Sequence, residues 1–184
     1  MAPVVGILAL QGDFEAHAKI VQALGAEPRE VRVAGQLEGL DGLIIPGGES
    51  TTMTLGIERE RLAEPLREVA RSGLPVLGTC AGMIVLDRDH LGLLDLRAER
   101  NAFGRQLRSF ETELEIEGLE GGPLHAVFIR APWVAEHGDA VEVLAEVDDH
   151  PVAVRARNLF AVAFHPEISG DTRLHALALG LNGR

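Results

Sequence analysis

The chain has 184 residues, one cysteine and a net charge of −11 from 17 basic and 28 acidic residues. This charge disfavours binding to nucleic acid and anionic lipid, and the longest apolar stretch, residues 74–86, is too short to span a bilayer. No internal disulfide is possible and no signal-peptide pattern is present, so we expect one cytoplasmic α/β domain over residues 1–184, with neither nucleic acid nor membrane as partner.

The first half of the chain alternates predicted strands and helices. In chain order we expect a strand at 4–10, a helix from Asp13 to a stop at Gly25, strands at 30–33 and 42–45, a helical stripe at 62–69, a strand at 76–78 and a helix at 81–87. This order is typical of a parallel, doubly wound sheet, whose ligands gather at the carboxyl ends of the strands.

The second half of the chain has a different pattern. Short β-like runs at 110–116, 126–129, 141–147, 152–157 and 159–164 are separated by turn residues, and a helix at 172–181 closes the chain. We expect these runs to be antiparallel additions to the sheet.

Cys80 stands at the centre of Gly78-Thr79-Cys80-Ala81-Gly82, between a predicted strand and a predicted helix. The two glycines permit a sharp turn that aims the side chain out of the sheet, and the helix N-terminus favours the thiolate. This placement suggests a nucleophile. A lone cysteine of this kind is otherwise most often a small buried hydrophobic residue.

His165 and Glu167 follow the run at 159–164, at another expected strand end. In extended chain, residues two apart project to the same side, so the carboxylate of Glu167 can reach the ring of His165. A carboxylate on one ring nitrogen fixes the tautomer and leaves the other nitrogen free to take a proton from a thiol. By itself a His-x-Glu pair also suits a surface ion pair, but together with Cys80 it predicts a Cys-His-Glu triad.

The triad also needs amide donors for an oxyanion. Gly47 and Gly48 offer unhindered amides after the strand at 42–45, and Ala81 opens the helix behind Cys80. We therefore predict an oxyanion hole made by the amides of Gly48 and Ala81, although an isolated Pro-Gly-Gly is also a common tight turn. Because Lys19 is the sole lysine and no Gly-Lys-Ser/Thr motif occurs, a phosphate-binding loop is not expected.

These residues resemble those of the class I, triad-type glutamine amidotransferases. Four further blocks narrow the resemblance to the family of glutaminase subunits of pyridoxal 5'-phosphate synthases. The blocks are Leu8-Ala9-Leu10-Gln11-Gly12, Pro46-Gly47-Gly48-Glu49-Ser50-Thr51-Thr52, Arg100-Asn101-Ala102-Phe103-Gly104-Arg105-Gln106 and Phe128-Ile129-Arg130-Ala131-Pro132. The resemblance covers essentially the whole chain and implies a three-layer, flavodoxin-like mixed sheet.

The resemblance also implies roles for individual residues. Cys80 would be the nucleophile and His165 and Glu167 would complete the triad. The glutamine-binding residues would be Gly47, Gly48, Glu49, Arg100, Ile129 and Arg130. Their chemistry agrees, because a carboxylate can accept from a substrate ammonium and an arginine matches an α-carboxylate.

The implied activity is hydrolysis of glutamine through a γ-glutamyl thioester, with delivery of ammonia to a (β/α) barrel synthase subunit, in an assembly of twelve copies of each. Neither a cofactor nor a metal is expected in this chain. The stretch at residues 86–91 is shorter than in many members, which puts a surface loop and a partner contact in doubt but no catalytic position.

Two alternatives remain open from the sequence. One is a thiol hydrolase that acts on γ-glutamyl compounds without a partner. The other is a non-catalytic redox sensor that uses Cys80 as an oxidisable thiol, for which a paired general base would be unnecessary.

Overall fold

The computed structural model describes residues 1–103 and 109–182. Within these ranges, a central sheet of seven strands has the order β2-β1-β3-β4-β11-β10-β9. Its strands are β1 (Val4–Leu8), β2 (Glu27–Val31), β3 (Gly42–Ile45), β4 (Val76–Thr79), β9 (Glu142–Val147), β10 (His150–Ala156) and β11 (Leu159–Val162). The first five strands in this order are parallel, whereas β10 and β9 are antiparallel to their neighbours.

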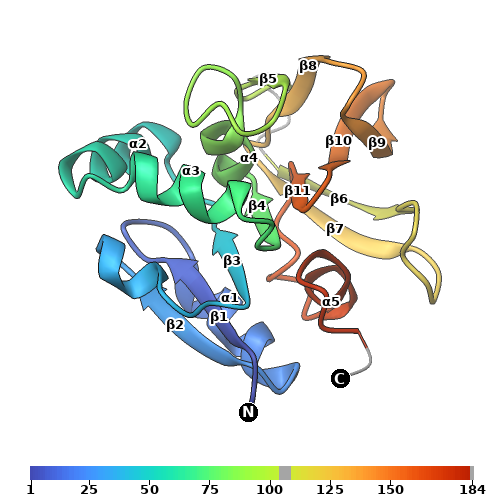
Figure 1. Ribbon diagram of the computed structural model, residues 1–184. Helices are drawn as coiled ribbons and strands as arrows, with labels where there is room; N and C mark the ends of the chain where they lie inside the picture. Colours follow the sequence, from blue (N-terminus) through green and yellow to red (C-terminus); the bar gives the residue numbers. More distant parts are fainter. Residues whose placement is uncertain (104–108, 183–184) are drawn as a thin grey trace.

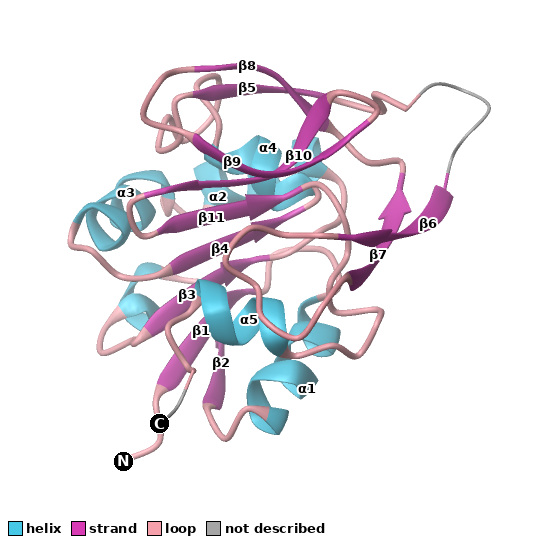
Figure 2. Cartoon of the chain, turned by 90° about the vertical axis from the view of Figure 1, so that its right-hand side faces the viewer, coloured by secondary structure: helices cyan, strands magenta, loops and turns pink. Residues whose placement is uncertain are grey.

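Helices cover both faces of this sheet. They are α1 (Phe14–Ala23), α2 (Ser50–Arg59), α3 (Ala63–Arg71), α4 (Ala81–Leu86) and α5 (Arg173–Ala178), with a 3-10 turn η1 (Ala34–Leu37) after β2. Helices α1 and α5 lie on one face, and α2, α3 and α4 lie toward the other (Figures 1 and 2). The predicted three-layer, doubly wound α/β fold is thereby confirmed.

Two small antiparallel ribbons accompany the central sheet. Strands β6 (Ser109–Leu114) and β7 (Leu124–Ile129) form one, and β5 (Leu96–Glu99) and β8 (Trp133–His137) form the other. The expectation that all the later β-like runs are antiparallel additions to the main sheet was therefore wrong for β6 and β7, which within the described ranges form a separate two-stranded sheet, and for β11, which is parallel to β4. Strands β5 and β8 were not expected.

Other boundaries differ for identifiable reasons. Strand β2 begins three residues before the expected Glu30, because Pro28 and its charged neighbours mask an edge strand that tolerates a missing amide donor. Helix α2 was not expected, since its threonine-rich sequence carries little apolar periodicity. Strand β1 ends at Leu8 rather than residue 10, and the last helix covers Arg173–Ala178 rather than 172–181.

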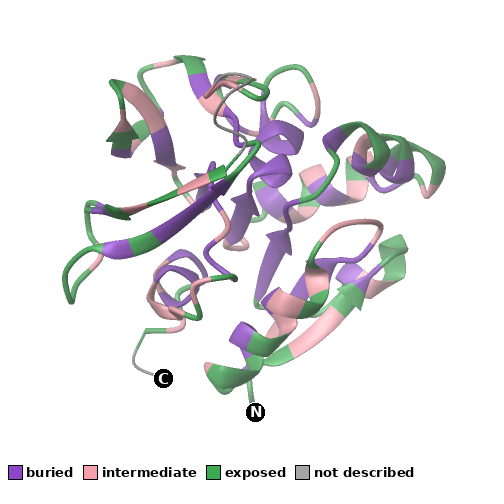
Figure 3. Ribbon diagram, turned by 180° about the vertical axis from the view of Figure 1, so that it is seen from behind, coloured by how far each residue is buried: buried purple, intermediate pink, exposed green. Residues whose placement is uncertain are grey.

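The core lies between the sheet and its helices. Strands β1, β3, β4 and β11 contribute runs of buried apolar residues, and all six residues of α4 are buried (Figure 3). At Gly82 a side chain would overlap the carbonyl oxygen of Ile45, so glycine there lets α4 lie directly against β3. No helix in the described ranges is both long and apolar enough to cross a membrane.

Candidate active site

Cys80 occupies the turn between β4 and α4. Its backbone has φ 49° and ψ −105°, a conformation that costs a non-glycine residue free energy and is typical of nucleophile turns. The turn is held on one side by the Cys80 amide, which donates to the carbonyl of Val162 in β11 at 2.8 Å. The residue is 6% exposed, and its sulfur lies 3.9 Å from the carbonyl oxygen of Ile129.

His165 and Glu167 follow β11 and face Cys80 across the sheet edge. The Nδ1 atom of His165 lies 2.7 Å from Oε1 of Glu167. The histidine side chain is 12% exposed and the glutamate side chain is fully buried. Burial acts to lower the pKa of His165, but hydrogen bonding to Cys80 and Glu167 outweighs it and raises the pKa to about 10. The ring is therefore a strong proton acceptor beside the thiol.

The loop after β3 approaches His165 and Cys80 at Gly47. A Cβ at this position would stand 2.5 Å from Cε1 of His165 and 3.3 Å from Cβ of Cys80, so only glycine lets the loop approach so closely. The carbonyl oxygen of Gly47 is directed at Gly12. Because the peptide is trans, the Gly48 amide points away from Gly12.

Ala81 is the first residue of α4, so its amide has no carbonyl partner within the helix. With Gly48 it lines the same pocket as Cys80. The two residues whose amides were predicted to form an oxyanion hole therefore border the same pocket as Cys80.

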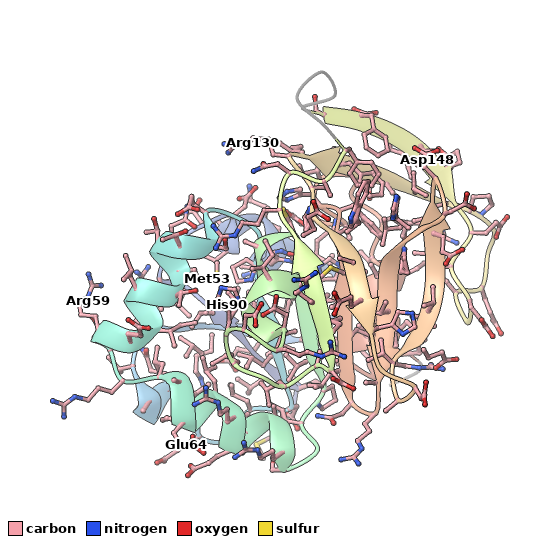
Figure 4. The ribbon with its side chains drawn as sticks, turned by 90° about the horizontal axis from the view of Figure 1, so that it is seen from above. Met53, Arg59, Glu64, His90, Arg130 and Asp148 are labelled. Carbon is pink, nitrogen blue, oxygen red and sulfur yellow. The ribbon has the colours of Figure 1, made fainter. Side chains whose placement is uncertain are left out.

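The pocket in front of Cys80 has a volume of about 300 Å³. Of the residues that the sequence predicted, it is lined by Gly48, Glu49, Cys80, Ala81, Arg100, Ile129, Arg130 and His165. Gly47 and Glu167 are not among the lining residues. Figure 4 shows Arg130 at the edge of the molecule, where it follows β7.

Glu49 has a structural role that the sequence did not predict. Its carboxylate accepts hydrogen bonds from the amides of Thr51 and Thr52, at 3.2 and 2.8 Å, and so caps the N-terminus of α2. The amides of Thr52 and Thr51 lower the pKa of Glu49 and keep it ionised. A substrate ammonium would therefore meet a carboxylate already held by the helix.

Arg100 follows β5 and also lines the pocket. Its Nη1 atom donates to the hydroxyl of Thr51 at 3.0 Å, which ties it to the first turn of α2. Residues 104–106 of the Arg100–Gln106 block lie outside the described part of the chain.

Sequence reasoning assigned no role to several other pocket residues, which are Gln11, Ser50, Ile84, Asn101 and Pro132. Gln11 is the most informative of them, because its Oε1 atom accepts from the amide of Glu49 at 2.7 Å. It follows β1, the neighbour of β3, so the rule that site residues gather at the carboxyl ends of adjacent strands could have found it.

Comparisons with known proteins agree with this geometry. The model of the SNO glutamine amidotransferase family matches residues 7–180. A protein of Frankia alni named pyridoxal 5'-phosphate synthase subunit PdxT is 55% identical, over 95% of this chain and 92% of that protein. The subunit of the same name from Moorella thermoacetica is 50% identical, over 97% and 99%.

Solved structures are similar as well. One described as a crystal structure of glutamine amidotransferase has a TM-score of 0.92 and 46% identity, and covers 98% of this chain and 99% of its own. The structure of PurLQS from Thermotoga maritima has a TM-score of 0.75 at 20% identity, over 99% of both chains, and supports the fold alone.

Proposed function

Because the chain belongs to the SNO glutamine amidotransferase family, we propose that it is the glutaminase subunit of a pyridoxal 5'-phosphate synthase, which hydrolyses glutamine to glutamate and ammonia. The observation that carries this proposal is the convergence of Cys80, His165 and Glu167 at one edge of the sheet, in front of a pocket. We place it in the cytoplasm.

The reaction begins with attack of the Cys80 thiolate on the side-chain amide carbon of glutamine. The negative charge that develops on the amide oxygen is stabilised by the amides of Gly48 and Ala81. Protonated His165 then gives its proton to the departing nitrogen, and ammonia leaves as the carbon–nitrogen bond breaks. The product on the enzyme is a γ-glutamyl thioester with Cys80.

Water completes the cycle. Neutral His165 removes a proton from water as the water oxygen attacks the thioester carbon, and the carbon–sulfur bond breaks to release glutamate and the thiolate. Glu167 holds the Nδ1 proton of His165 throughout, so that Nε2 is the nitrogen that exchanges protons.

Charged side chains and backbone groups make separate contributions to glutamine binding. Arg100 has a guanidinium that matches the α-carboxylate of the substrate, and the carboxylate of Glu49 lies within the same pocket for the α-ammonium. Gly47, Gly48, Ile129 and Arg130 would supply the backbone around the side-chain amide.

Ammonia needs an acceptor, and the relatives are named as subunits of a synthase. We propose that the partner is the (β/α) barrel synthase subunit, in an assembly of twelve copies of each chain. Adding this partner should raise the rate of glutamine turnover; an unchanged rate over a titration of partner would contradict the coupling.

The direct test is Cys80→Ala, assayed for ammonia release from glutamine with the synthase present. We expect loss of activity with an unchanged unfolding temperature, whereas the exposed-histidine control His125→Gln should retain full activity. Substantial residual glutaminase activity of Cys80→Ala would contradict the proposal. Wild-type turnover of γ-glutamyl peptides without partner would instead indicate a stand-alone hydrolase, and peroxide-sensitive partner binding without glutaminase activity a redox sensor.

A further inference from the structure

Two buried histidines lie behind the triad, on the side away from the pocket. His17 belongs to α1 and His175 to α5, and both are fully buried. Their rings are 5.1 Å apart, and Nδ1 of His17 lies 2.8 Å from Nε2 of His175. The two helices lie on the same face of the sheet (Figure 2). The mechanism described above uses neither residue.

His17 also contacts the catalytic residues. Its Nε2 atom lies 3.5 Å from Oε2 of Glu167, the carboxylate oxygen that His165 does not use. The same nitrogen lies 3.2 Å from the hydroxyl of Thr79, the residue before Cys80. His17 therefore joins the first helix to both sequence segments that carry the triad.

The two ends of this chain of contacts lack partners. Among the described residues, Oε2 of Glu167 and Nδ1 of His175 are the buried side-chain polar atoms without a hydrogen bond. A buried polar atom without a partner costs free energy, and a buried donor or a charged oxygen costs more than a bare ring nitrogen. The protons in this region should be arranged to keep that cost low.

Both histidines are neutral near pH 7. Burial, with the neighbouring charges of His175 and His165, holds the pKa of His17 well below its usual value. Burial lowers the pKa of His175 to about 4, against an opposing effect of Asp171, which is itself paired with Arg173 at 2.6 Å. Each neutral ring carries one N–H, so the 2.8 Å contact needs one donor and one acceptor.

Two arrangements of these protons are possible. If His17 carries its proton on Nδ1, its bare Nε2 faces the carboxylate of Glu167, and His175 is left with a buried N–H that has no acceptor. If His175 instead donates from Nε2, His17 carries its proton on Nε2 and directs it at Glu167 and Thr79. The second arrangement directs a proton toward the buried carboxylate and leaves His175 with a bare nitrogen, rather than an N–H, without a partner, so it is favoured.

We propose that His17 is a positioning residue of the glutaminase reaction: as the Nε2–H tautomer, fixed by His175, it directs its proton at Oε2 of Glu167 across 3.5 Å. This inference rests on the proposed function. A donor on the second oxygen fixes the plane of the buried carboxylate and hence the direction in which Glu167 accepts the Nδ1 proton of His165. His17 thereby controls how Nε2 of His165 is aimed at Cys80.

The tautomer is tested on the wild-type chain with ¹⁵N-labelled histidine. Long-range proton–nitrogen spectra distinguish a protonated ring nitrogen from a bare one. We expect His17 and His175 both to be protonated on Nε2 and bare on Nδ1. A proton on Nδ1 of His17, or a doubly protonated ring at pH 7, would overturn the proposal.

The positioning role is tested with two substitutions at the same site. His17→Leu removes the donor, whereas in His17→Gln the amide nitrogen replaces Nε2–H. In the complex with the synthase subunit, we expect His17→Leu to lower kcat about 10–100-fold, the loss of a hydrogen bond to a charged group, with little change in KM. His17→Gln should recover most of that kcat.

The matched control is Val21→Ala, which removes buried apolar atoms from the same helix and leaves His17 in place. It should lower the unfolding temperature and leave kcat unchanged. A folded His17→Leu with wild-type kcat, or a His17→Gln as impaired as His17→Leu, would overturn the proposal. If His17→Leu does not fold, the tautomer measurement decides. Absence of glutaminase activity in the wild-type complex would contradict the proposed function while leaving the tautomer result intact.

Discussion

The two sides of the His165–Glu167 pair differ in access to water and in the residues that build them. In front, a pocket of about 300 Å³ is lined by charged and polar groups held on loops, such as Arg100 and Glu49. Behind, His17 and His175 are fully buried between helices and the sheet. The pocket can therefore admit and release substrate, whereas the buried region around His17 and His175 cannot. Substitutions of the substrate-binding residues in front should therefore act mainly on KM, and substitutions behind mainly on kcat and stability.

Glu167 is the residue where the two sides meet, so changing it should have the largest effect. In Glu167→Gln an amide can present an N–H to His165 and stabilise the wrong tautomer. We expect ammonia release by the complex with the synthase to fall about 1000-fold or more. The measurement is initial-rate ammonia release, with unfolding temperature as the folding control. Activity within tenfold of wild type would show that the carboxylate does not orient the ring.

On the front side, Arg100→Ala tests substrate binding. Loss of a charge-assisted hydrogen bond to the α-carboxylate should raise KM for glutamine about 10–100-fold, with kcat nearly unchanged. The matched control is Arg97→Ala, which removes an exposed arginine from β5 that pairs with Glu136 at 2.8 Å. It should leave both constants unchanged. A lower kcat at constant KM in Arg100→Ala would contradict the expectation that substitutions of substrate-binding residues in the pocket act mainly on KM.

The front of the site was largely predictable from sequence, and the back was not. Cys80, His165 and the Gly47-Gly48 pair each follow a strand, and parallel strands bring their carboxyl ends to one edge. His17 and His175 are separated by 158 positions and lie inside two helices that read as ordinary packing elements. Their contact depends on how α1 and α5 meet beneath β4, which local periodicity does not encode.

The sequence also predicted only one of the two roles of Glu49. The resemblance assigned it to the substrate ammonium, and the residue does border the pocket. Its carboxylate is also the cap of α2, a helix that apolar periodicity did not predict. Serine, threonine, aspartate and asparagine are the usual residues at the start of a helix, so a glutamate at this position did not indicate one.

The two buried histidines should also make the stability of the protein sensitive to acid. The pKa of His175 is about 4 in the folded chain and about 6.5 when unfolded, so the unfolded state takes up a proton first as pH falls. Stability from His175 is complete above about pH 7 and is lost below it. Between pH 7 and 5 the free energy of unfolding should fall by about 2 kcal/mol from this residue, with His17 adding to the loss.

Urea unfolding at pH 7, 6 and 5 measures this loss, and His175→Phe should reduce its slope because the apolar ring has no proton to gain. Asp171 does not interfere, since its lowered pKa leaves it ionised in this window.

His125 provides a control of opposite sign: Glu113 and Glu111 raise its pKa, so its contribution to stability is complete at low pH and is lost as pH rises. His125→Gln should therefore keep the acid loss seen in wild type. Equal slopes in wild type and His175→Phe would mean that the buried pair does not resist protonation, and the contrast between the sealed back and the open front would then rest on geometry alone.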